Sequence, residues 1–175
     1  MTLKREHKLK LSDIDHVIAH IHENEISVIC EPMVHKARPQ NSYDAQFSVN
    51  YLIAATFIRE QFGLAELEDD VLSDPLILDL CAKTSYEPDP DSAYPDYFSG
   101  AVTIHTHDGR TLHHREQMNR GSAENPMSDS DIKEKFLGNA TRTISTTQAE
   151  IVMRLVLEIE HAPDLESLAN ALTNP

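Results

Sequence analysis

An Asp-Gly dipeptide between two alternating segments constrains the fold of this chain more than any other feature. Asp108-Gly109 separates residues 100–107 from residues 110–117, and polar and apolar side chains alternate in both segments. Asp-Gly between alternating segments is the strongest short signal for a β-hairpin with a two-residue turn. The spacing therefore predicts an antiparallel hairpin, with these expected pairs: 107 with 110, 105 with 112, and 103 with 114.

Histidines are concentrated in this hairpin and in an earlier alternating segment. The predicted register places three of them on one face of the hairpin: His105, His107 and His114. Three others share one face of the earlier segment: His16, His20 and His22. Three imidazoles on a rigid sheet can hold zinc, but no carboxylate is placed by the sequence to orient these rings. We expect the solvated face of an antiparallel sheet and no metal.

The order of the remaining elements predicts an α+β fold. Residues 13–30 alternate, which predicts a half-buried strand and a second short strand over residues 25–30. Residues 43–62 carry apolar side chains three or four positions apart, which predicts a helix capped by Asn41 or Ser42. Strands, helices, a hairpin and further helices indicate an antiparallel sheet with helices packed on it.

The remaining helix starts and the domain boundaries follow from local signals. Asp74-Pro75 predicts one helix start, and two capping boxes predict two more, Ser128 with Asp131 and Thr147 with Glu150. We expect a basic N-terminal tail over residues 1–12. A single α+β domain is expected over residues 13–175.

The charge of the chain excludes several classes of partner. Lys and Arg number 15 against 29 Asp and Glu, a formal net charge of −14 at pH 7. Nucleic-acid and anionic-membrane binding both require clustered cations, so neither partner is expected. Most of the excess acid lies between Leu64 and Ser99, where we expect a solvated outer face.

The cysteines and the apolar segments predict a cytoplasmic protein. Cys30 and Cys81 belong to no Cys-x-x-Cys pair, so a zinc ribbon, a thioredoxin-like centre and a disulfide framework are not expected. The first residues are charged, unlike a secretory signal. No apolar segment is long enough to cross a membrane.

Arg38 and Tyr51 are the residues least explained by packing alone. Arg38 lies in an extended segment before the helix predicted over residues 43–62. Tyr51 lies on the apolar stripe of that helix, and two roles are open for it. It is either a core residue whose hydroxyl bonds a polar partner, or a phenol that contacts a substrate in a polar cleft.

Six segments stand in a fixed order along roughly residues 13–160: residues 44–55 (DAQFSVNYLIAA), Leu72–Pro75, Val102–Arg110, Arg120-Gly121, Asn125–Ser128 and Lys135-Phe136. This ordered set resembles the MmgE/PrpD family, which includes 2-methylcitrate dehydratase, cis-aconitate decarboxylase and iminodisuccinate epimerase. Family members are much longer. They have a large helical domain with most of the catalytic groups, followed by a smaller α+β domain over the active site, and only the smaller (lid) domain is similar to this chain.

The resemblance implies a role and a set of site residues. Tyr51 matches a family tyrosine that faces the active site, which makes it the expected catalytic residue, and the expected substrate-binding residues are Ser48, Arg38 and Arg120. Family enzymes act on di- and tricarboxylates by proton abstraction and use no metal or organic cofactor. The expected partners are a small carboxylate substrate and a helical MmgE/PrpD domain, and the chain alone is expected to be inactive.

A second hypothesis keeps the fold and removes the catalysis. In this alternative the chain is a stand-alone interaction or scaffold domain, and the surface that would meet the helical domain forms a homodimer. Tyr51 is then an ordinary core residue. An exposed apolar patch beside Tyr51 would indicate a face from which a partner is missing.

Overall fold

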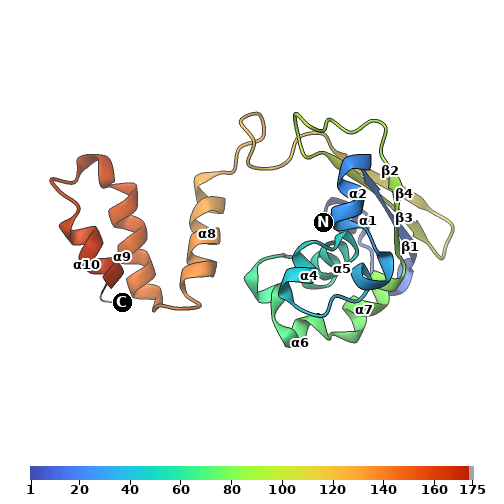
Figure 1. Cartoon of the computed structure of the whole chain (residues 1–175), viewed down its shortest axis with the longest axis horizontal. Helices are drawn as coiled ribbons and strands as arrows, with labels where there is room; N and C mark the ends of the chain where they lie inside the picture. Colours follow the sequence, from blue (N-terminus) through green and yellow to red (C-terminus); the bar gives the residue numbers. More distant parts are fainter. Residues whose placement is uncertain (174–175) are drawn as a thin grey trace. The chain divides into compact units, whose positions relative to one another are not determined.

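The chain forms two compact units. The computed structural model describes residues 1–173, and the two units are Met1–Asn119 and Arg120–Pro175. Figure 1 shows the first unit as a sheet with helices and the second as helices alone. The sequence predicted one domain over residues 13–175, whereas the fold divides after Asn119.

The first twelve residues are part of the first unit, where the sequence predicted a tail. Helix α1 spans Thr2–His7 and the short 3₁₀ helix η1 spans Leu11–Asp13. Leu3 and Leu9 are buried in the main core of the unit. The ammonium of Lys4 donates to the carbonyl oxygen of Phe57 at 2.7 Å. The sequence prediction gave weight to the basic residues of this segment and overlooked Leu3 and Leu9, whose buried side chains hold the segment to the core.

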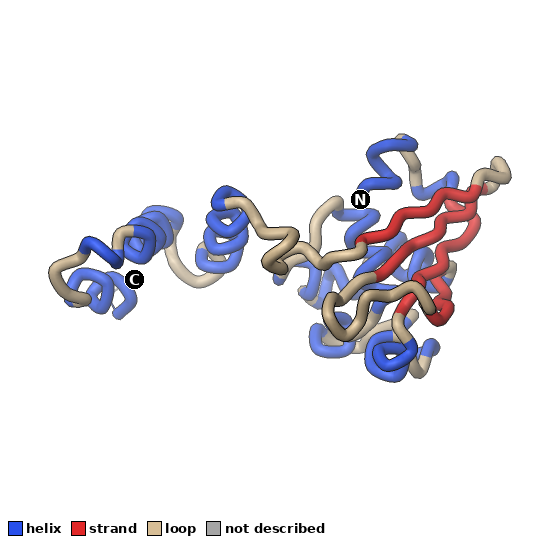
Figure 2. Tube along the Cα trace, turned by 90° about the horizontal axis from the view of Figure 1, so that it is seen from above, coloured by secondary structure: helices blue, strands red, loops and turns tan. Residues whose placement is uncertain are grey.

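A four-stranded sheet organises the first unit. Its strands are β1 (Ile14–Ile21), β2 (Thr84–Pro88), β3 (Gly100–Thr106) and β4 (Thr111–Glu116), in the spatial order β2-β1-β3-β4. The α+β class is confirmed. The sheet is mostly antiparallel, but β2 runs parallel to β1 because the chain returns through several helices before it pairs. Figure 2 shows the strands side by side.

A helix replaces the second strand predicted over residues 25–30. Helix α2 spans Glu23–Ile29, and the ring of His22 accepts a hydrogen bond from the backbone N–H of Asn24 at its start. Glu23 and Glu25 lie in the first turn, where negative charge is favourable. The short alternation was therefore misleading, since its apolar residues also fit one side of a two-turn helix.

The helix predicted over residues 43–62 is two helices. Helix α4 spans Ser42–Gln46, with Asn41 as its N-cap, and α5 spans Val49–Arg59, with Ser48 as its N-cap. The Ser48 hydroxyl accepts the backbone N–H of Tyr51 at 3.0 Å. This side-chain bond satisfies one of the free N–H groups at the start of α5, which explains why a new helix begins directly after Ser48.

The remaining helices of the first unit are short. Asp74 caps α7 by accepting the backbone N–H of Leu76 at 2.9 Å, as the sequence predicted. These short helices and one 3₁₀ helix are α3 (Met33–Lys36), η2 (Leu64–Leu67), α6 (Asp69–Leu72) and α7 (Pro75–Ala82).

One face of the sheet forms the core of the first unit. Figure 1 shows its helices gathered on one side of the strands. Residues from β1, β3, α5 and α7 meet there in one cluster, which includes Val17, Ile104, Tyr51 and Leu80. The opposite face of the strands carries the alternate positions, among them His16, His20 and His105, and it is the more polar face.

The hairpin turn is one residue longer than predicted. Thr106 N–H donates to the carbonyl oxygen of Arg110, and Gly109 N–H donates to that of Thr106. Gly109 adopts φ +87°, which suits the left-handed position of a three-residue loop with a bulge. The pairs are therefore His105 with Thr111, Thr103 with His113 and Val102 with His114. His114 consequently lies on the face opposite His105, so the predicted group of three histidines was wrong.

The second unit is helical. It contains α8 (Asp129–Ala140), α9 (Thr146–Leu157), the 3₁₀ helix η3 (Ile159–His161) and α10 (Glu166–Thr173). The capping box of Ser128 with Asp131 is confirmed. Helix α9 is capped by Ser145 through Gln148, two residues before the predicted start. In the described part of both units, no helix is long and apolar enough to cross a membrane.

Candidate functional site

Tyr51 is buried in the core of the first unit. Its exposed fraction is 0%, and its hydroxyl donates to the backbone carbonyl oxygen of Glu66 at 2.6 Å. The ring meets Phe62 edge to face. Burial raises the pKa of the Tyr51 phenol to about 12, so the hydroxyl keeps its proton at neutral pH. Of the two roles left open for Tyr51, this geometry favours packing.

Ser48 ties the start of α5 to α3. Besides capping α5, its hydroxyl donates to the carbonyl oxygen of Lys36 at 2.6 Å. The Lys36 ammonium in turn donates to the carbonyl oxygens of Val28 and Phe47. Ser48 is fully buried and both of its hydrogen-bonding capacities are used, so it positions Tyr51 and the α3 segment.

Arg38 lies two residues beyond Lys36, at the surface. Its backbone carbonyl oxygen accepts the side-chain amide of Gln40 at 2.9 Å. Its side chain is exposed, and within residues 1–173 no carboxylate pairs with its guanidinium. Arg38 is therefore the one predicted site residue of the first unit that can meet an anion from solvent.

Arg120 belongs to the second unit. Its guanidinium pairs with Asp131 near the start of α8, and its side chain is 63% exposed. Hydrogen bonds from Ser128 and from Arg120 lower the pKa of the Asp131 carboxyl to about 2. The structure thus brings Ser48, Tyr51 and the Arg38 segment together in one unit and places Arg120 in the other.

Tyr43 is an exposed phenol that the sequence did not single out. It lies on α4, five residues before Ser48, and is 69% exposed. Its ring lies 5.1 Å from that of Phe47, measured between centroids. Exposed apolar side chains of α2 and α3 belong to the same stretch of chain: Val28, Met33 and Val34. Its only sequence signal was its position at the start of the helix predicted over residues 43–62, which says nothing of exposure.

Two carboxylates of the acid-rich segment between Leu64 and Ser99 are buried, and both are held by hydrogen bonds within the fold. Glu66 accepts the backbone N–H of Gly63 at 2.8 Å and the side-chain amide of Gln61 at 2.9 Å. Asp89 forms a two-fold hydrogen bond with the guanidinium of Arg115, both distances being 2.8 Å. These bonds lower the pKa of the Asp89 carboxyl. The solvated face predicted for this segment therefore has two structural exceptions.

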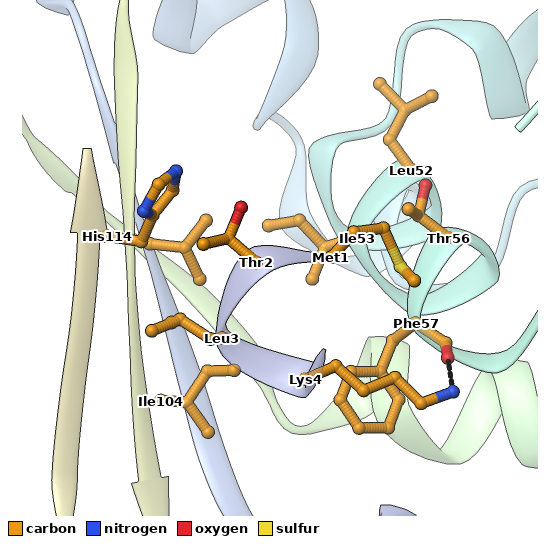
Figure 3. A pocket seen from close by; sticks show the side chains of 11 residues that line it. Met1, Thr2, Leu3, Lys4, Leu52, Ile53, Thr56, Phe57, Ile104 and His114 are labelled. Carbon is orange, nitrogen blue, oxygen red and sulfur yellow. Dashed lines mark hydrogen bonds between the residues drawn. The ribbon is translucent and has the colours of Figure 1, made fainter. Parts of the chain in front are cut away.

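A cavity of about 300 Å³ lies between α1, α5 and the sheet. Figure 3 shows Leu3, Phe57 and Ile104 around it, with the Lys4 ammonium bonded to the Phe57 carbonyl oxygen. Lys4 also pairs with Glu60 at 2.7 Å, so its charge is already matched. The predicted site residues do not line this cavity, and its apolar wall does not suit a polycarboxylate.

The described residues offer limited metal or thiol chemistry. Across residues 1–173, no group of three or more His, Cys, Asp or Glu side chains is arranged to hold a metal ion. Cys30 and Cys81 are buried free thiols. Burial raises the pKa of Cys30 to about 11 and that of Cys81 to about 12, so neither is a ready nucleophile at neutral pH.

Comparison with known proteins identifies the chain's relatives. The MmgE/PrpD C-terminal domain matches residues 1–159. The chain is 24% identical over 144 residues to cis-aconitate decarboxylase of Homo sapiens and 23% identical over 143 residues to that of Mus musculus. It is 25% identical over 132 residues to the cis-aconitate decarboxylase-like protein oryM of Aspergillus oryzae.

These matches cover most of this chain and little of each relative. They span 81%, 81% and 75% of the chain but only 30%, 29% and 27% of the respective relatives. The part in common is the α+β sheet unit together with the first helices of the second unit. The chain therefore belongs to the MmgE/PrpD family, of which it carries the C-terminal domain.

Proposed function

We propose that this chain is the lid component of a lyase or isomerase that acts on a di- or tricarboxylate, with cis-aconitate as the first substrate to test. One observation carries the proposal: a C-terminal family domain fills residues 1–159, while the chain spans about 30% of the length of cis-aconitate decarboxylases. A part that small supplies a share of the active site and depends on a helical partner for the rest.

The side chains of the first unit support an accessory role. Proton abstraction next to a carboxylate needs a base within hydrogen-bond reach of the substrate. Tyr51 keeps its proton at neutral pH, and its hydroxyl is bonded to Glu66. The base is therefore expected from the helical partner, and Arg38 is the group of this unit that would bind a substrate carboxylate.

The exposed apolar side chains of the second unit support the proposal that a helical domain binds this chain. Among its described residues only Ala149 and Val152 are buried hydrophobic side chains. Large apolar side chains are exposed on all of its helices and just before α10: Ile132, Ile151, Val156, Leu157, Ile159, Leu165 and Leu172. Exposed apolar surface of this kind marks a protein interface, and the helical family domain is the partner we propose for it. Arg120 would then reach the substrate from this unit once Asp131 releases it.

A cytoplasmic location is part of the same proposal. Cys30 and Cys81 are both free and both buried, which agrees with a reducing compartment.

The experiment compares the chain alone with the assembled enzyme. The chain is mixed with the helical portion of a family member, and cis-aconitate decarboxylation and methylcitrate dehydration are followed by product formation. We expect no turnover by the chain alone, a complex in sedimentation, and turnover in the mixture. Arg38→Gln is expected to raise KM in the mixture, while Arg5→Gln, at another exposed arginine of the first unit, serves as the control. Turnover by the chain alone, or a homodimer that excludes the helical portion, would contradict the proposal.

A further inference from the structure

The cavity between α1, α5 and the sheet has no part in the proposed function. Its volume is about 300 Å³, and residues of α1, α5, β3 and β4 line it. An apolar cavity of about 150 Å³ holds one benzene-sized molecule, so this one has room for roughly twelve non-hydrogen atoms. Its volume is at the lower end of the range in which proteins bind small molecules.

The floor of the cavity is apolar and buried. Leu3, Phe57 and Ile104 form it, with exposed fractions of 7%, 8% and 5%, and Figure 3 shows their side chains around the space. Branched aliphatic side chains extend this lining: Leu52, Ile53 and Val102. The Lys4 ammonium lies over the Phe57 ring, 4.9 Å from its centroid, and covers one face of it. The lining therefore suits an aliphatic chain better than an aromatic ring that would need a face to stack on.

The rim of the cavity is half-buried, so a ligand can enter from solvent. Leu52, Thr56 and Val102 line the cavity and are neither fully buried nor fully exposed. Thr2 and Thr56 add hydroxyl groups to the lining, and in the view of Figure 3 both hydroxyls lie away from the Phe57 ring. A hydroxyl both donates and accepts a hydrogen bond. An apolar chain with one hydroxyl group at its end matches the floor and the rim together.

The charged side chains that line the cavity already have partners. Lys4 donates to the Phe57 carbonyl oxygen and pairs with Glu60, both at 2.7 Å. His114, which lines the cavity from β4, has Nε2 2.8 Å from a carboxylate oxygen of Glu116. A carboxylate ligand would have to displace Glu60 from Lys4, whereas an uncharged ligand leaves both pairs in place. Burial of an unpaired charge in an apolar site is costly, so the cavity favours an uncharged ligand.

We propose that this cavity is a binding site for one uncharged, medium-chain aliphatic molecule with a hydroxyl group at one end. The aliphatic chain lies against Leu3, Ile53 and Ile104, and the hydroxyl group bonds a threonine hydroxyl at the rim. Because the ligand contacts α1, α5 and β3 together, it holds α1 to the rest of the first unit. The inference concerns this cavity alone and does not depend on the proposed function.

The first test titrates the full chain with the straight-chain primary alcohols from hexanol to dodecanol, followed by NMR shifts of leucine and isoleucine methyl groups. Each added methylene is expected to tighten binding about three- to fourfold from hexanol to decanol. The gain is expected to stop between decanol and dodecanol, because the space holds roughly twelve non-hydrogen atoms. Decanoate is expected to bind about tenfold more weakly than decanol, since Glu60 already pairs with Lys4.

A pair of variants separates the cavity from the rest of the surface. Thr56→Phe places a ring in the cavity and is expected to weaken decanol binding about tenfold or more, because the ring takes the space of the chain. The matched control is Glu6→Phe, which adds the same ring at an exposed position of α1 that does not line the cavity. This control is expected to bind decanol as the unmodified chain does.

A further measurement needs no variant and so is unaffected if Thr56→Phe does not fold. Nuclear Overhauser contacts are expected between the decanol chain and the methyl groups of Leu52 and Ile104. The proposal is overturned if these contacts are absent and decanol instead contacts exposed side chains of the second unit, such as Leu157 and Leu165. It is also overturned if affinity keeps rising beyond decanol, if decanoate binds as tightly as decanol, or if Thr56→Phe keeps full binding.

Discussion

The two compact units of this chain differ in how much apolar surface each buries. In the first unit, Ile14, Tyr51, Ile77 and Leu80 have an exposed fraction of 0% and belong to one core. In the described part of the second unit, the buried hydrophobic side chains are Ala149 and Val152 alone. Burial of apolar area is the main favourable term in folding. The difference indicates that the first unit is stabilised by its own core, whereas the described part of the second unit buries little apolar surface of its own.

The largest expected effect on stability comes from a substitution in the core of the first unit. Leu80→Ala removes a fully buried side chain of α7 and leaves a cavity. We expect a loss of about 2–5 kcal/mol in the free energy of unfolding of this unit, measured by urea titration. The control is Leu76→Ala on the same helix, whose side chain is 53% exposed and should change stability by less than about 0.5 kcal/mol. Equal effects of the two variants would show that α7 does not pack as described.

The next effect concerns the buried ion pair of Asp89 with Arg115. Because hydrogen bonds from Arg115 lower the pKa of the Asp89 carboxyl, the pair stabilises the folded state above the carboxyl's unfolded pKa, about 3.9. That stability is lost as the pH falls through the folded pKa. Asp89→Asn should cost about 1.5–3 kcal/mol at pH 7 and flatten the acid side of the stability curve. Asp96→Asn, at an exposed carboxylate, should change neither.

A smaller loss is expected from the Tyr51 hydroxyl. Tyr51→Phe keeps the ring and leaves the Glu66 carbonyl oxygen without its 2.6 Å donor. The expected cost in stability is about 1–3 kcal/mol, read from chemical denaturation. Tyr43→Phe removes an exposed hydroxyl and should be neutral. If Tyr51→Phe leaves stability unchanged and instead abolishes turnover in the assembled enzyme, Tyr51 has the catalytic role predicted for it.

The smallest effect on stability is expected in the second unit. Ile151→Ser on α9 and Ile132→Ser on α8 replace exposed apolar side chains. Each should change the stability of the isolated chain by less than about 0.5 kcal/mol. Both should weaken binding to a helical partner in calorimetry, because interface anchors lose affinity when truncated. Lys133→Ser, at an exposed charged residue of α8, is the control. A large loss of stability in the isolated chain would mean that these side chains pack within the unit.

The sequence predicted local features better than three-dimensional relations. The α+β class, the helix capped by Asp74 and the capping box at Ser128 were all readable, because each depends on side chains a few residues apart. The hairpin was readable but its register was not. An Asp-Gly pair suits both a two-residue turn and a three-residue loop with Gly109 left-handed, and these differ by one residue.

The candidate site was predicted only in part. The surroundings of Tyr51 depend on Glu66, fifteen residues away, whose carbonyl oxygen accepts the phenol. No local sequence pattern predicts such a contact, because the contact forms only when α5 packs against the segment before α6. The sequence placed Ser48 inside one helix over residues 43–62 and so missed its role as the N-cap of α5. Its second bond, to Lys36, depends on a fold that brings α3 beside α5. Arg38 is exposed, as an arginine without a charge partner usually is, and its role in substrate binding stays a prediction.

The most direct test of the difference between the units is native-state hydrogen exchange on the full chain. Amides in β1, β3 and α5 should exchange only through global unfolding of the first unit, whereas amides in α8, α9 and α10 should exchange through low-energy opening. Addition of the helical family partner should protect the second group and leave the first nearly unchanged. Equal protection of both units in the isolated chain would contradict the account, and so would the absence of any added protection with the partner bound.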